Sequence, residues 1–164
     1  MNREYIMLEL TSWLVNFVEK PNPLLDDWAP CPYSRQARIN NLLQIVFADS
    51  NKLTDAVDQA LPLLDTKDVV IICFDHNQIA ADLVETLVGD LNRKLMPTDH
   101  VILEDHPDRI ELLNGVSMNF GKCGLLLLQK LSKLTVASDQ LKQKGYYDSW
   151  SAESLDYVVS WRHQ

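Results

Sequence analysis

The sequence lacks any hydrophobic run of the ~18 residues that a membrane-spanning helix needs, because polar residues interrupt every apolar stretch. It also lacks a basic cluster, since 15 lysines and arginines are dispersed among 23 acidic residues and the formal net charge is −8. Nucleic-acid binding draws on phosphate neutralisation by clustered basic side chains, so the composition argues against a nucleic-acid partner. The start, Met1–Tyr5, carries an acid where a secretion signal would be basic. We expect a cytoplasmic protein without membrane attachment.

Cysteine is scarce, and this scarcity excludes a disulfide framework. Cys31, Cys73 and Cys123 are odd in number and widely spaced, which fits a reducing compartment. Cys73 lies within an apolar run and is expected in the core. With 164 residues, 46% of them hydrophobic, the chain is long enough to bury a core without cross-links. The sequence therefore predicts one domain over residues 1–164.

Alternating helical and strand patterns predict an α/β fold. Apolar side chains recur every three or four residues over 3–19 and 77–95, which indicates two amphipathic helices. A third helix is expected over 49–61. Short apolar runs typical of strands cover 42–48, 69–74 and 101–103. This order predicts a small, largely parallel sheet of three or four strands with helices packed on it, plus an N-terminal helix and a helical C-terminus.

Two segments leave alternatives open. Residues 105–123 are expected to form a loop, an added strand near 116–120, or both. The four leucines at 125–128 fit a buried strand, but apolar side chains continue at helical spacing as far as Leu141. This spacing favours a helix over 122–144, ended by Gly145. Ser151 then predicts the start of a short final helix.

Two Asp-His pairs follow predicted strands, Asp75-His76 and Asp105-His106. Ligands gather at the carboxyl ends of parallel strands, so these side chains and Asp108 converge if the two strands are neighbours. Imidazole nitrogen and carboxylate oxygen suit zinc or iron, which makes Asp75, His76 and His106 candidate metal ligands. A histidine beside a carboxylate also makes a general base. The structural alternative is that polar residues simply begin the loops that follow strands.

Cys31 lies between Pro30 and Pro32 in an irregular, proline-rich segment, which would hold the thiol in one place. Arg35, four residues later, could lower the pKa of the thiol or bind a carboxylate or phosphate. Cys31 is therefore a candidate nucleophile or metal ligand. The alternative is a small residue packed beneath aromatic rings, as most free cysteines are.

Cys31-Pro32-Tyr33 and the later His106-Pro107-Asp108, followed by Gly115 and Asn119, resemble an uncharacterised bacterial family. In this domain of unknown function, Cys-Pro-Phe follows an N-terminal helix and His-Pro-Asp follows a later strand. The resemblance spans residues 13–134. Family members tend to have Arg-Ser-Pro-Tyr-Pro where this chain has Phe-Gly-Lys-Cys-Gly at 120–124. The resemblance implies that Cys31, His106, Asp108 and Asn119 share one site, and it implies no particular reaction.

The first functional hypothesis is a small enzyme with a thiol- or metal-dependent site. Cys31 would be nucleophile or metal ligand, and His106 would be base or ligand, oriented by Asp108. Arg35 and Asn119 would bind a small anionic substrate. Zinc or iron is the divalent metal that such a site would use.

The second hypothesis is a non-catalytic protein-binding or regulatory module, with a homodimer as one form of it. Its irregular segment over 21–38 would present Trp28 and Tyr33 to a protein partner, because aromatic residues are common interface anchors. A lesser alternative is an acidic inhibitor of a nucleic-acid-binding protein. The distance between the Cys31 sulfur and the His106 ring would separate the first two hypotheses.

Overall fold

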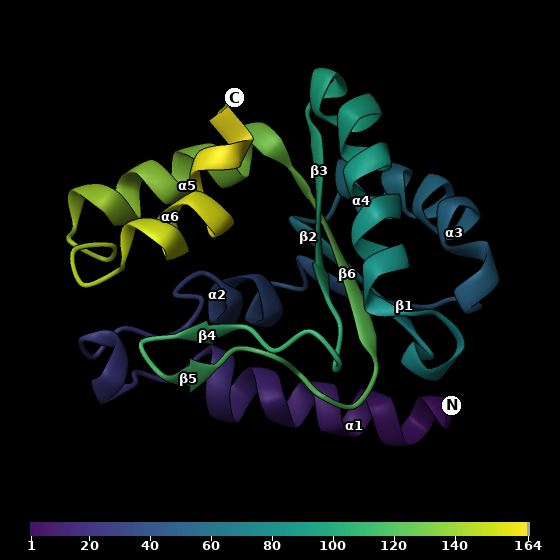
Figure 1. Ribbon diagram of the computed structural model, residues 1–164, viewed down its shortest axis with the longest axis horizontal. Helices are drawn as coiled ribbons and strands as arrows, with labels where there is room; N and C mark the ends of the chain where they lie inside the picture. Colours follow the sequence, from purple (N-terminus) through teal and green to yellow (C-terminus); the bar gives the residue numbers. More distant parts are fainter. Residues whose placement is uncertain (164) are drawn as a thin grey trace.

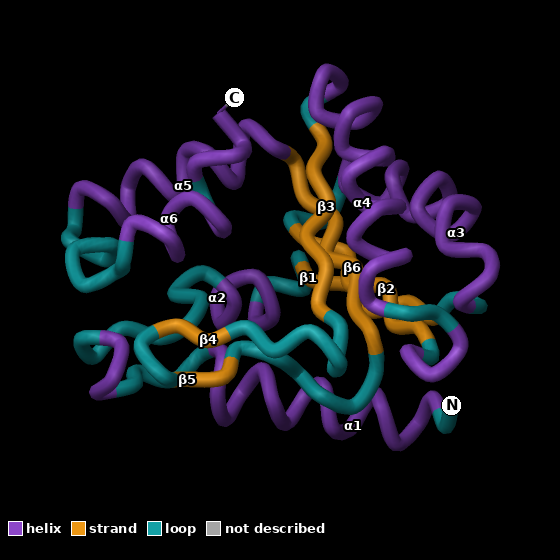
Figure 2. Tube along the Cα trace, in the orientation of Figure 1, coloured by secondary structure: helices purple, strands orange, loops and turns teal. Residues whose placement is uncertain are grey.

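A four-stranded sheet lies at the centre of the molecule, enclosed by helices (Figure 2). The computed structural model describes residues 1–163. The strand order is β1 (Leu43–Phe47), β2 (Val69–Phe74), β6 (Gly124–Lys130) and β3 (His100–Asp105). A separate two-stranded hairpin consists of β4 (Leu112–Leu113) and β5 (Val116–Ser117), so the segment over 105–123 contains both loop and strand.

The main sheet is mixed, which corrects the prediction of a largely parallel sheet. β1 and β2 pair in parallel, whereas β6 runs antiparallel to both β2 and β3. The helix predicted over 122–144 is wrong in its first part, because α5 begins only at Leu131 (Leu131–Gln143). Residues 125–128 are paired along both edges of β6. Hydrogen bonds on both sides and burial on both faces override the helical spacing of these leucines.

The helices at the N-terminus, after β1, after β2 and at the C-terminus confirm the predicted α/β pattern with shifted ends, whereas a short helix over 34–39 corrects the expectation that residues 21–38 are irregular. Their bounds are α1 (Arg3–Trp13, extended by a π-helical turn at Leu14–Val18), α2 (Ser34–Ile39), α3 (Leu53–Ala60), α4 (Ala81–Leu95) and α6 (Ala152–Val158). In Figure 1, α3 and α4 lie together on the right, α1 runs along the bottom, and α5 and α6 lie at the upper left.

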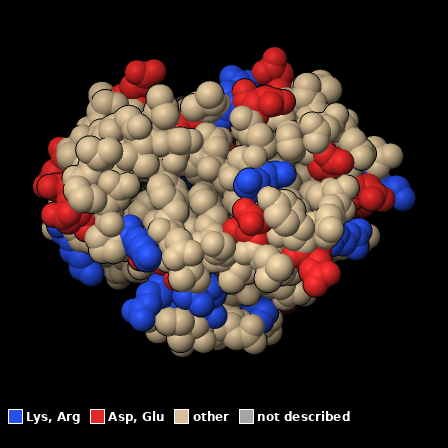
Figure 3. All heavy atoms as spheres, turned by 90° about the horizontal axis from the view of Figure 1, so that it is seen from below, with Lys and Arg blue, Asp and Glu red and all other residues tan. Residues whose placement is uncertain are grey.

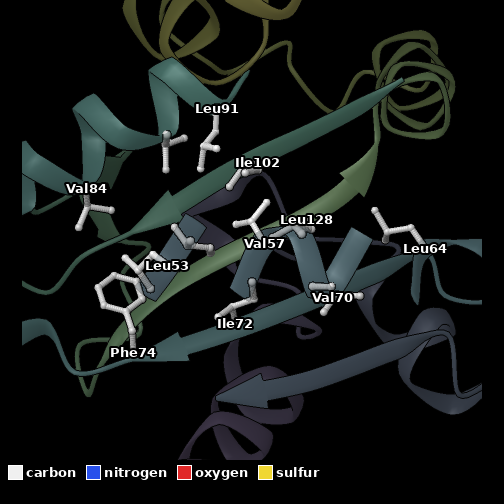
Figure 4. Close-up of a cluster of buried hydrophobic side chains, with 13 residues drawn as sticks. Leu53, Val57, Leu64, Val70, Ile72, Phe74, Val84, Leu91, Ile102 and Leu128 are labelled. Carbon is white, nitrogen blue, oxygen red and sulfur yellow. The ribbon is translucent and has the colours of Figure 1, made fainter. Parts of the chain in front are cut away.

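Both faces of β2 are buried, which accounts for its uninterrupted apolar sequence. Val70, Ile72 and Phe74 point into the core formed with α3 and α4 (Figure 4). Ile71 and Cys73 point the other way, into a second core that includes the apolar face of α1 and the buried Cys123. The core position of Cys73 is therefore confirmed.

The insertion of β6 between β2 and β3 changes what lies at the end of the sheet. A parallel arrangement would have made β2 and β3 neighbours, but they flank β6 instead. The start of β6 requires glycine, because a Cβ at Gly124 would lie 2.1 Å from Cζ of the Phe74 ring. Phe74 thus packs directly over β6, and the loops that follow β2 and β3 meet beyond it.

Candidate functional site

The two Asp-His pairs do lie at one end of the sheet, on either side of the start of β6. The ring centroids of His76 and His106 are 5.8 Å apart. His106 is buried, its Nε2 lies 2.9 Å from the carbonyl oxygen of Ile79, and the amide of Asp108 donates to its Nδ1 over 3.2 Å. These partners fit a neutral ring that donates from Nε2 and accepts at Nδ1. Both nitrogens of His106 therefore hold the loop that follows β3.

Asp75 and His76 are engaged differently. Asp75 accepts hydrogen bonds from the backbone and side chain of Asn77, which lower the pKa of its carboxyl, and it lies 3.8 Å from the amino group of Met1. Nδ1 of His76 is buried without a hydrogen-bond partner among the described residues. Within residues 1–163, no three His, Cys, Asp or Glu side chains lie close enough to hold a metal ion. A metal on His106 would have to displace one of the ring's hydrogen bonds, and the metal site stays a prediction.

Cys31 precedes α2 and lies in surroundings that do not favour the thiolate. Although the residue as a whole reaches solvent, burial against the surrounding chain raises the pKa of the thiol. The backbone amides of Tyr33 and Ser34 oppose this rise in the pKa, and the Glu19 carboxylate adds to it. A thiol with a raised pKa stays protonated at neutral pH, unlike that of a typical nucleophilic cysteine. No hydrogen bond or ring contact in the described part of the chain joins Cys31 to His106.

The other residues predicted around Cys31 take separate positions. Arg35 is exposed and forms no ion pair within the described residues. The Trp28 ring packs edge-on against Tyr146 with centroids 5.4 Å apart. The Tyr33 hydroxyl donates to the carbonyl oxygen of Ala137 over 3.3 Å. Both rings therefore make contacts within the protein.

Asn119 organises the loop between β3 and β6. Its Oδ1 accepts from the amide of Glu111 over 2.7 Å, and its Nδ2 donates to Oδ1 of Asp105 over 2.6 Å. Oδ2 of Asp105 accepts from the amide of Phe120 over 2.8 Å. Burial raises the pKa of the Asp105 carboxyl, and these donors oppose that rise. Asn119 thus holds the backbone of Glu111 in place through a hydrogen bond to its amide.

Glu111 reaches into a groove that sequence patterns did not reveal. The groove has a volume of about 390 Å³ and is lined by residues of α4, β3, α6 and the C-terminal turn. Its apolar lining comprises Val88, Gly89, Leu103, Val158 and Trp161, and its acidic lining comprises Glu85, Glu104, Glu111 and Asp156. A volume of a few hundred Å³ with mostly apolar walls is typical of small-molecule sites. Periodicity places apolar residues on the last helix but gives no sign that this helix faces β3, which lies about fifty residues earlier.

Two carboxyls in the groove have perturbed acidity. Burial and the nearby carboxylate of Asp105 raise the pKa of Glu111 to about 7, while the Tyr157 hydroxyl, which donates to its Oε1 over 3.1 Å, opposes the rise. Burial also raises the pKa of Glu104. In the described chain, neither Glu104 nor Glu111 has a cationic group within 4.0 Å.

The basic side chain that acts on both carboxyls is already engaged elsewhere. The Arg109 guanidinium lies 2.6 Å from Asp82 and 2.5 Å from Glu85, both on α4. These ion pairs bind the loop to the first turns of α4. The inner carboxyls, Glu104 and Glu111, are left as hydrogen-bond acceptors on an apolar surface.

The surface on the side of α1 differs from the groove in the side chains that it exposes. Seen from the side of α1, acidic and basic side chains lie near the centre as well as around the margin, with uncharged surface between them (Figure 3). Tyr5 and Leu8 on α1 are among the exposed large apolar residues. None of the helices in residues 1–163 is both long and apolar enough to cross a membrane.

Comparisons with protein-family models, curated proteins and solved structures found no match. The resemblance based on Cys31-Pro32-Tyr33 and His106-Pro107-Asp108 stays a prediction. The geometry of the sites themselves is therefore the basis for assigning a function.

Proposed function

We propose that the protein is a small-molecule-binding protein whose groove along β3 takes an organic cation. The observation that carries this proposal is an apolar groove of about 390 Å³ in which Glu104 and Glu111 have no cationic partner among the described residues. Apolar walls favour a ligand with a hydrocarbon body, and two unneutralised carboxyls favour a positive charge on it. A small anionic substrate, which Arg35 suggested, would meet electrostatic repulsion in this groove.

Aromatic side chains add to this preference. Tyr157 and Trp161 both line the groove. A cation within about 6 Å of an aromatic face gains roughly 0.5–2 kcal/mol, depending on how much water is excluded. The rings would therefore complement the charge on the ligand as well as its apolar body.

Three probes of nearly equal size and different charge test the proposal: benzylamine, benzyl alcohol and benzoate. Each is titrated into the isotopically labelled protein at pH 8, and the shifts of the Trp161 indole and the Gly89 amide are followed by NMR. We expect the benzylammonium cation to bind at least ten times more tightly than the alcohol, with benzoate weakest, because only the cation matches the carboxyls.

Two variants locate the binding. Replacing Glu111→Gln and Glu104→Gln together removes the charges, so the cation should lose its advantage over the alcohol. Asp58→Asn is the matched control, because Asp58 is an exposed acid on α3 away from the groove. Equal affinity for the three probes, or tightest binding of benzoate, would overturn the proposal.

The thiol- or metal-dependent enzyme built on Cys31 and His106-Pro107-Asp108 is a second candidate. It is favoured by the buried Nδ1 of His76, which has no described partner and belongs to a ring 5.8 Å from that of His106. Metal analysis of protein purified without a histidine tag tests it. Stoichiometric zinc or iron that is lost in His106→Ala would support this candidate, whereas metal-free protein with an unreactive Cys31 thiol would refute it.

A further inference from the structure

The carboxyl of Glu111 is enclosed by other acids. Glu104 and Asp105 on β3 both act on it electrostatically, and the Tyr157 hydroxyl of α6 donates to it over 3.1 Å. The basic group that acts on it is the Arg109 guanidinium, which is shared between two carboxylates of α4. Ionised Glu111 therefore lacks an adequate counter-charge, and a proton is the simplest neutralising group.

Every element packed around the groove contributes to this balance. The titratable groups that line it are Glu85 from α4, Glu104 from β3, Glu111 from the loop after β3, and Asp156 and Tyr157 from α6. The charges of Asp105 on β3 and Arg109 in the loop after β3 also act on Glu111. The acidic side chains in this set outnumber its one basic side chain, Arg109. Because the Glu111 side chain is partly buried, water screens this repulsion less than it would at an open surface.

We propose that a ligand ammonium takes the place of the proton on Glu111, so that the groove exchanges one proton for one bound amine. This inference rests on the proposed function and names the ligand class within it: a small amine that is cationic at neutral pH. On binding, the O–H bond of the neutral carboxyl breaks and its proton leaves to solvent. The carboxylate that remains then accepts a hydrogen bond from the ammonium N–H.

The consequence is a defined pH dependence. With a pKa of about 7, Glu111 is about 90% protonated at pH 6 and about 10% at pH 8. Binding of benzylamine should release about 0.9 proton at pH 6 and about 0.1 at pH 8, and the apparent affinity should rise about tenfold between them. Stronger binding at higher pH is the expected direction, because the ligand competes with a proton.

Isothermal titration calorimetry of the full chain with benzylamine measures the released protons directly. Titrations at several pH values from 6 to 8 are each run in two buffers of different ionisation enthalpy, since the difference in observed heat gives the number of protons. Glu111→Gln should abolish proton release, and Asp58→Asn should leave it unchanged. Tyr157→Phe removes a donor to the carboxylate, so it should shift the midpoint of proton release to higher pH.

The outcomes separate the two proposals. Binding of benzylamine without proton release, or with release unchanged in Glu111→Gln, would overturn the proton exchange and leave the cation groove standing. Absence of binding at all pH values would overturn the groove proposal and the exchange together. If Glu111→Gln does not fold, the midpoint in Tyr157→Phe still decides, because an unshifted midpoint contradicts the role of Glu111.

Discussion

Glu111→Gln is expected to make the protein more stable at pH 8 and to leave its stability nearly unchanged at pH 4. The pKa of Glu111 rises from 4.5 to about 7 on folding. Between these values the folded protein binds more protons than the unfolded chain, so this group lowers the free energy of unfolding as pH rises through the window. Above about pH 7 the full destabilisation by ionised Glu111 is present. Glutamine does not ionise, so the variant lacks this destabilisation.

The magnitude follows from the shift. At about 1.4 kcal/mol per pKa unit, full relief of the penalty would amount to about 3 kcal/mol. The side chain is partly open to the groove, so screening by water reduces the expected gain to about 1–2 kcal/mol. For a chain of this length, that corresponds to a rise in Tm of about 2–8 °C at pH 8.

Urea unfolding followed by circular dichroism, at pH values from 4 to 8, measures the effect, with Asp58→Asn as the control. The difference in unfolding free energy between wild type and Glu111→Gln should grow with pH and level off above about pH 7. A difference that is constant with pH, or a variant less stable than wild type at pH 8, would refute the claim that folding raises the pKa of Glu111.

Three further substitutions test the fold around the site. Gly124→Ala should destabilise the protein by about 3 kcal/mol in urea unfolding, because the new methyl group would collide with a buried aromatic ring. Arg38→Met should lower Tm more than Arg35→Met does, because only Arg38 neutralises the buried Glu19 carboxylate, over 2.8 Å. Asn119→Ala should cost about 1–3 kcal/mol and speed proteolysis between β3 and β6, since it removes the bonds that hold that loop.

Local sequence patterns were sufficient to predict most helices and the strands β1, β2 and β3, because each of these elements has an apolar pattern of its own. They failed at 125–128, where four consecutive leucines satisfy a helix and a buried strand equally. What decides that segment is hydrogen bonding to β2 and β3 on both sides, which is a property of the assembled sheet. Sequence spacing also could not show that a later strand would enter between two earlier ones.

The predicted site residues divide in a similar way. His76 and His106 lie close together, as expected of polar residues at strand ends. Their strands, β2 and β3, are not adjacent, but only β6 separates them. Sequence patterns could not show that one nitrogen of His106 would accept from Asp108 in its own loop while the other contacts Ile79 in the segment after β2. Nor could they link Glu104 and Glu111 to Tyr157, because the last helix reaches them only through tertiary packing.

The groove is lined by β3, which is an edge strand of the sheet. With β6 paired to β2, β3 becomes an edge strand, and a free edge is a hazard because it can pair with another chain. Asn92 of α4 covers part of this edge, since its side chain donates to the carbonyl oxygen of Ile102 over 2.9 Å and accepts from its amide over 2.8 Å. The neighbouring Leu103 and Glu104 are left as a wall of the groove. Had β3 been an inner strand, as a parallel arrangement would allow, a further strand would occupy the edge along which the groove runs.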